Sequence, residues 1–125
     1  MGSHDLQLAA EARRAVMRLL DGVPGDLERL RADAGLVVAE LVSNALRHGG
    51  GLVAFEAAVT PDGSGLRLQV NDASAARPVA RRTLGADPEK PGGFGWPIIE
   101  RLASSVEVEV LPVGGKRIVV VLPLA

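Results

Sequence analysis

The first half of the chain carries apolar residues at helical spacing. From Asp5 to about Leu20 they recur every three or four residues, until a glycine and proline stretch at 22–25 ends the run. A second, longer run begins after Asp26, a residue suited to capping a helix, and stops at the glycines 49–51. The pattern therefore predicts two helices, and Gly35 is a place where the second helix could bend or break.

The second half changes to the alternation that is typical of strands. Residues 52–59 and 66–72 flank the turn Pro61-Asp62-Gly63-Ser64-Gly65, which predicts a hairpin. The elements expected after it are a short helix at 96–103, a strand at 106–110 and a final, mostly buried strand at 116–124.

This order of elements predicts an α+β fold. Two pairs of hairpin strands and three helices favour a two-layer α/β sandwich, with helices on one face of a mixed, mostly antiparallel sheet. We expect one domain from residue 5 to 125, because the opening 1–4 resembles a cloning remnant. Residues 73–92 contain prolines, glycines and charges without a period, and this predicts a lid or binding loop.

Composition narrows the classes of function. The chain has 125 residues, a net charge of -1, no cysteine and three aromatic residues. Disulfides and thiolate metal sites are excluded, and nucleic-acid binding is disfavoured because it usually needs a basic face and stacking aromatics. Since no apolar stretch approaches the roughly 20 residues of a membrane span and no leader opens the chain, we expect a soluble, cytoplasmic protein.

Three polar residues share a face of the second predicted helix. Glu40, Asn44 and His48 are spaced four residues apart, at the edge of the apolar stripe. One interpretation is a solvated helix face; the other is an amide oxygen for a hard cation beside a carboxylate that acts as general base. His48 on its own fits the helix dipole better than a zinc site, which would need further ligands.

Two features flank the predicted lid. Asp72 ends a strand, where it could cap a turn or accept a hydrogen bond from the exocyclic amine of a ligand. The glycines of 92–95 precede a helix, where they could be hinges or could present backbone N–H groups to phosphate. We expect Phe94 and Trp96 to anchor the core or the loop.

The basic residues of the loop also admit two interpretations. They could belong to a solvated loop, or to a lid that closes on an anionic ligand. These residues are Arg77, Arg81, Arg82 and Lys90.

Taken in order, three segments resemble the sequence boxes of the GHKL ATP-binding superfamily, which includes gyrase and sensor histidine kinases. They are Glu-Leu-Val-Ser-Asn-Ala-Leu-Arg-His-Gly at 40–49, Val-Asn-Asp at 70–72 and Gly-Gly-Phe-Gly-Trp-Pro-Ile-Ile at 92–99. The resemblance covers residues 5–125 and implies the Bergerat-type ATP-binding fold. A domain of this length is most similar to the small bacterial anti-sigma-factor serine/threonine kinases.

The resemblance implies a role for each matching residue of the helix. Asn44 would hold Mg²⁺ on the triphosphate of ATP, and Glu40 would orient or deprotonate the attacking seryl hydroxyl or water. His48 would lie near the nucleotide.

The other two boxes imply contacts to the base and the phosphates. Asp72 would accept a hydrogen bond from the adenine amino group, and Gly93 and Gly95 would bring N–H groups to the phosphates. Two departures stand out: glycines usually follow the aspartate, whereas residues 73–77 have none, and Trp96 stands where the family usually has a smaller residue.

The function implied is that of an ATP- and Mg²⁺-dependent serine/threonine protein kinase. Its protein partners would be a sigma factor, a small antagonist that it phosphorylates, and a second copy of itself, with no direct contact to nucleic acid or membrane. Two alternatives stay open: a catalytically silent regulatory binding module with this fold, and an ATPase-like component of a larger signalling assembly.

Overall fold

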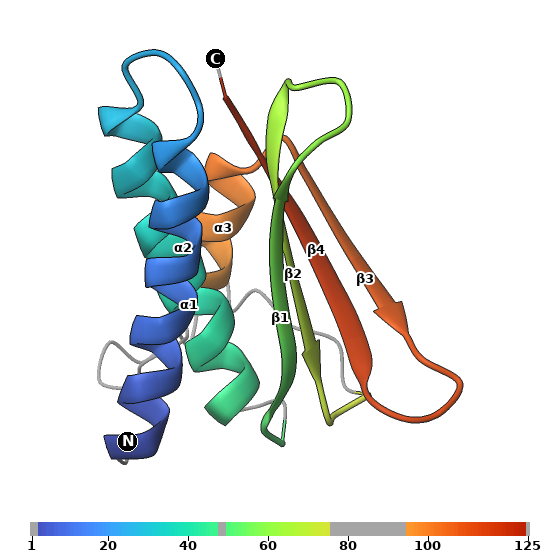
Figure 1. Cartoon of the computed structure of the whole chain (residues 1–125). Coiled ribbons are helices and arrows are strands. Elements are labelled where there is room, and N and C mark those ends of the chain that lie inside the picture. The colour runs from blue at the N-terminus through green and yellow to red at the C-terminus, as the bar shows by residue number, and fades with distance from the viewer. Residues whose placement is uncertain (1–2, 48–49, 76–94, 125) are drawn as a thin grey trace.

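The computed structural model describes residues 3–47, 50–75 and 95–124. The helices form one layer and the strands the other (Figure 1), so the expected α+β two-layer sandwich is confirmed. In chain order the elements are α1 Ser3–Asp21, α2 Glu28–Arg47, β1 Leu52–Val59, β2 Gly65–Asp72, α3 Gly95–Leu102, β3 Ser105–Val110 and β4 Lys116–Pro123.

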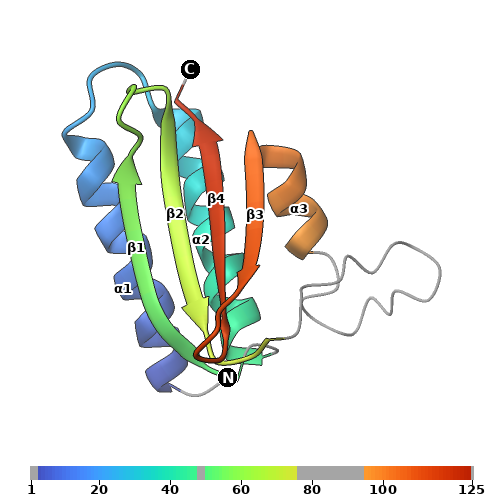
Figure 2. The same ribbon diagram turned by 90° about the vertical axis from the view of Figure 1, so that its right-hand side faces the viewer.

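The four described strands form one sheet in the order β1-β2-β4-β3, with every neighbouring pair antiparallel. Figure 2 shows this sheet face-on, with the helices behind it. The two hairpins, β1 with β2 and β3 with β4, are those that the sequence predicts. They meet through β2 and β4, which are the two inner strands.

The helical layer forms where the apolar spacing predicts it. On α1, Ala12, Val16 and Leu20 are buried at intervals of four residues. Asp26 caps α2 as expected, because its Oδ1 accepts a hydrogen bond of 3.2 Å from the backbone N–H of Glu28. α2 continues through Gly35 without a break.

The core lies between α2 and the inner face of the sheet. Cross-strand partners on that face are buried apolar pairs: Leu66 with Leu122, Leu68 with Val120, and Val70 with Ile118. From α2, Leu41 and Val42 pack against this row, and the fully buried leucines contribute roughly 2 kcal/mol each. This row of pairs runs toward the ends of β2 and β4, where the candidate site begins.

One sequence prediction about the sheet was wrong. The final strand was expected to be mostly buried, but β4 alternates between buried and half-buried positions. The reason is that the described helices cover only one face of the sheet, so Val119 and Val121 lie on the open face.

The remaining boundaries differ from the prediction by a residue or two. α1 extends back to Ser3, into the segment that resembles a cloning remnant, and α3 begins at Gly95. Among the described residues, every helix is too short or too polar to cross a membrane.

Candidate functional site

The apolar row between β2 and β4 ends in a charged pair. The next cross-strand partners after Val70 and Ile118 are Asp72 and Lys116. Because side chains alternate between the faces of a strand, both stand on the inner, helix-facing side. They are the two buried charged residues of the described chain, each about 4% exposed.

Asp72 and Lys116 form a close ion pair. The Lys116 Nζ lies 2.8 Å from Oδ2 and 3.0 Å from Oδ1 of Asp72, so the ammonium spans both carboxylate oxygens. The same Nζ donates to the backbone carbonyl of Ser74 at 3.2 Å. Buried charges are tolerated when they are paired and hydrogen-bonded in this way.

Asp72 also caps the turn after β2. Its Oδ1 accepts a hydrogen bond of 3.0 Å from the backbone N–H of Ser74. The turn-capping interpretation of Asp72 is therefore confirmed, while its contact to the amine of a ligand stays a prediction.

A glycine from another hairpin touches the same strand end. Gly115 has a φ of 78°, in the left-handed region, and a Cβ at this position would collide with the backbone carbonyl oxygen of Asp72. The resembled superfamily usually has the pattern Asp-x-Gly-x-Gly at this strand end. In this chain, a glycine lies against Asp72 from the turn that leads into β4.

The other half of the candidate site is the C-terminal part of α2. Glu40 and Asn44 are both half-buried and lie one turn apart, beside the buried stripe of Leu41, Val42 and Ala45. The amide oxygen of Asn44 is a hard donor suited to Mg²⁺, and the carboxylate of Glu40 can accept a proton. Within the described residues, no group of three His, Asp or Glu side chains could hold a metal ion.

Backbone contacts tie the end of α2 to the end of β2. The chain leaves α2 through a hydrogen bond from Gly51 N–H to the Ala45 carbonyl at 3.0 Å. Ala73 N–H then donates to the Gly51 carbonyl at 3.3 Å, and Ala73 lies against Gly50. The predicted helix box and the predicted aspartate box are therefore neighbours in space.

The third box contributes the start of α3. Gly95 is the first residue of this helix, and that end of α3 lies toward the same end of the molecule as the end of β2 (Figure 2). Trp96 is buried in the core cluster, so it anchors α3 as expected. Backbone N–H groups of the first helical turn have no partner within the helix, which suits them to bind an anion.

Several predicted site residues lie outside the described residues. They are His48, Gly93 and Phe94, most of the loop 73–92, and its basic residues Arg77, Arg81, Arg82 and Lys90. Their roles stay predictions.

The comparisons with known proteins decide the family. A family model described as the histidine kinase-like ATPase domain matches residues 3–122. The chain belongs to this family. A search of curated proteins found no match.

The match to the histidine kinase-like ATPase domain covers all three boxes and places the chain in the GHKL superfamily, as the sequence indicated. Its α+β architecture agrees with that of the superfamily. ATP binding is the property that this family suggests.

Sequence reasoning missed the partner of the aspartate in this ATPase domain. Lys116 opens the final strand and looks like an ordinary surface lysine. The sequence does indicate which way Lys116 faces, because every second residue of a strand lies on the same face. Residues 118, 120 and 122 share a face with Lys116, and all three are apolar. That pattern places Lys116 on the buried face, but it does not reveal which residue lies opposite.

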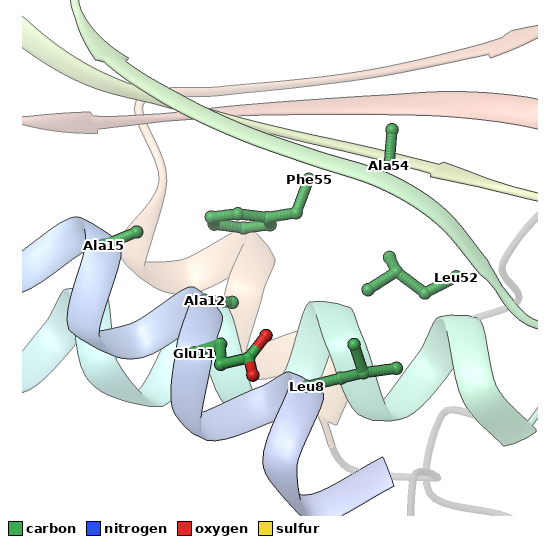
Figure 3. Close-up of a pocket in the computed structure, with 7 residues that line it drawn as sticks. All are labelled: Leu8, Glu11, Ala12, Ala15, Leu52, Ala54 and Phe55. Atoms are coloured by element: carbon green, nitrogen blue, oxygen red, sulfur yellow. The ribbon is translucent and has the colours of Figure 1, made fainter. Parts of the chain in front are cut away.

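A hollow lies between α1 and the edge strand β1. It is a groove of about 340 Å³, and Figure 3 shows the side chains around it. Leu8 and Ala15 of α1 line it, whereas Val16 and Leu20 are in the core. The apolar positions of the first helix are therefore divided between core and surface. The other lining residues are Glu11, Ala12, Leu52, Ala54 and Phe55.

Proposed function

We propose that this ATPase domain is an ATP-dependent serine/threonine protein kinase of the anti-sigma-factor type. It would bind a sigma factor and phosphorylate a small antagonist protein on serine. The observation that supports this most strongly is that Glu40 and Asn44 are half-buried on α2, and that backbone hydrogen bonds tie the end of α2 to the end of the strand that carries Asp72. A second copy of the chain is a further partner in this proposal.

Each described residue has one task in the proposed reaction. Bound MgATP supplies the phosphoryl group and the charge of the cation. Asn44 holds the cation through its side-chain oxygen, and Glu40 accepts the proton of the seryl hydroxyl. Asp72 accepts a hydrogen bond from the adenine amine. The first turn of α3, at Gly95, presents N–H groups to the phosphates.

A transfer assay with radiolabelled MgATP tests the proposal. The substrates to be tested are small serine-containing proteins whose genes neighbour the gene of this chain. We expect Glu40→Gln to lower the rate of transfer about 100-fold or more, because general-base catalysis contributes about that much. Glu56→Gln is the matched control, since Glu56 is exposed on the outer face of β1.

The control variant is expected to keep the rate of the unaltered protein. Transfer that persists at the original rate in Glu40→Gln would remove Glu40 from the mechanism. If the unaltered protein transfers no phosphate to any serine substrate, the kinase proposal is wrong.

The second candidate is a catalytically silent module that keeps the fold and binds a protein partner. The ion pair of Asp72 and Lys116 favours it, because the carboxylate that would recognise adenine is already occupied within the protein. Partner binding that is independent of nucleotide, together with no phosphate transfer, would support this candidate.

A further inference from the structure

The ammonium of Lys116 contacts three oxygen atoms of the protein. A lysine ammonium carries three N–H groups and no acceptor. The structure gives its Nζ three acceptors, which are Oδ1 and Oδ2 of Asp72 and the carbonyl oxygen of Ser74, at 3.0, 2.8 and 3.2 Å. All three contacts of the ammonium are therefore made within the protein.

Both carboxylate oxygens of Asp72 also have partners within the protein. Oδ1 accepts from both Lys116 Nζ and Ser74 N–H, while Oδ2 lies 2.8 Å from Nζ in the ion pair. The side chain of Asp72 is 2% exposed and that of Lys116 is 4% exposed. The ammonium of Lys116 therefore lies against both of the oxygens that an approaching amine would use.

We propose that Lys116 is an internal competitor of the nucleotide base. Its ammonium occupies the carboxylate of Asp72, and a base can use that carboxylate only after the ammonium has moved away from at least one oxygen. This inference rests on the proposed role of Asp72 in base recognition. Lys116 thereby sets the affinity of the domain for nucleotide.

The direction of the effect follows from a simple equilibrium. When only a fraction of the molecules is competent to bind, the apparent dissociation constant rises by the inverse of that fraction. A charge-assisted hydrogen bond strongly favours the arrangement in which the Lys116 ammonium occupies Asp72. Removing it should therefore tighten MgATP binding about tenfold or more.

Two substitutions of Lys116 test this. Lys116→Gln keeps a donor for Asp72 but removes the charge, and Lys116→Met keeps the volume and removes the donor as well. Because loss of one partner of a buried ion pair can unfold a protein, both variants are made, and cooperative unfolding is checked first. Either variant that folds answers the question.

The matched control is Arg117→Gln, the same change of charge at the next position. Arg117 stands on the opposite face of β4, where its guanidinium pairs with Glu109 at 3.3 Å. We expect this control to bind MgATP as the unaltered protein does. The double variant Asp72→Asn with Lys116→Gln should show no gain in affinity for MgATP, because the carboxylate that the change at Lys116 would free is then missing.

Calorimetric titration with MgATP gives the answer. A dissociation constant about tenfold lower in Lys116→Gln or Lys116→Met, with Arg117→Gln unchanged, supports the competitor role. Unchanged or weaker binding in the folded Lys116 variants overturns it, and so does a gain that survives in the double variant.

The same titration separates this inference from the kinase proposal. If the unaltered protein binds no MgATP while the Lys116 variants do, Lys116 is the competitor and the native domain is the silent module. If the unaltered protein binds and transfers phosphate but the Lys116 variants bind no better, the kinase proposal stands and the inference fails. If no form binds, both fail.

Discussion

At the scale of single residues, Asp62 shows how local hydrogen bonds fix a turn. Its Oδ1 accepts hydrogen bonds from the Thr60 hydroxyl at 2.7 Å, the Ser64 N–H at 3.0 Å and the Ser64 hydroxyl at 2.7 Å. These donors favour the ionised carboxylate. They lower the pKa of Asp62 from 3.8 to about 2, with the Thr60 hydroxyl as the largest cause.

The pKa of Asp62 predicts how the turn responds to acid. The folded value lies below the unfolded one, so the stabilisation is present above pH 3.8 and is lost as the pH falls toward about 2. An NMR titration of the carboxyl carbon should give a pKa of about 2. Ser64→Ala, which removes one donor, should raise it, and an Asp62 that titrates at its ordinary value in the unaltered protein would refute the turn geometry.

Gly115 lies so close to the backbone of Asp72 that a side chain at this position would not fit. Gly115→Ala meets both a left-handed φ and the carbonyl oxygen of Asp72, and we expect a loss of about 3 kcal/mol in the free energy of unfolding. Gly114→Ala is the control, because its φ is 100° but nothing lies within 4 Å of the added Cβ. It should lose about 1 kcal/mol. Equal losses in urea denaturation would mean that the contact with Asp72 costs nothing.

At the scale of elements, Gly35 sits where α1 packs on α2. A Cβ there would lie 3.3 Å from Nε of Arg13 and 3.6 Å from Cε of Met17. Arg13 is exposed, so the end of its side chain has room to move. The helix itself favours alanine over glycine by about 1 kcal/mol.

Gly35→Ala is therefore expected to raise the free energy of unfolding by about 0.5 kcal/mol, with part of the helix gain offset by the shift of Arg13. Gly35→Leu should lower it, because a larger side chain would separate the helices. Urea denaturation measures both. A destabilised Gly35→Ala would show that the Arg13 side chain cannot give way.

The elements themselves were largely predictable from the sequence. Apolar spacing is a local signal, and it gave the helices and strands to within a residue or two. The burial of the last strand was not predictable, because Val119 and Val121 are as apolar as their neighbours. Only the arrangement of the layers shows that these two residues stand on the open face.

The candidate site was predictable only in part, because it also depends on which strands become neighbours in the sheet. Glu40 and Asn44 share a helix face, which their spacing reveals. The pairing of Lys116 with Asp72 joins residues 44 positions apart through the contact of β2 with β4. No local pattern encodes which strands become neighbours in a sheet.

At the scale of the whole molecule, the candidate site gathers at one end of the two layers. The end of α2, the end of β2, the start of β4 and the start of α3 all contribute to it. The core row of the sheet holds Asp72 and Lys116 in place, while α2 positions Glu40 and Asn44. The groove between α1 and β1 lies on another side of the same core.

We expect this end of the molecule to bind MgATP through Asn44. Thermal unfolding with and without millimolar ATP and Mg²⁺ tests it, beside Asn44→Ala. Asn71→Ala is the matched control, because Asn71 stands on the outer face of β2 and accepts a hydrogen bond from Gln69 at 3.3 Å.

A ligand at 100 times its dissociation constant adds about 2.7 kcal/mol, a rise of roughly 10 °C in the midpoint for a domain of this size. We predict a Mg²⁺-dependent rise in the unaltered protein and in Asn71→Ala, and its loss in Asn44→Ala. An equal rise in Asn44→Ala, or none in the unaltered protein, would contradict the account.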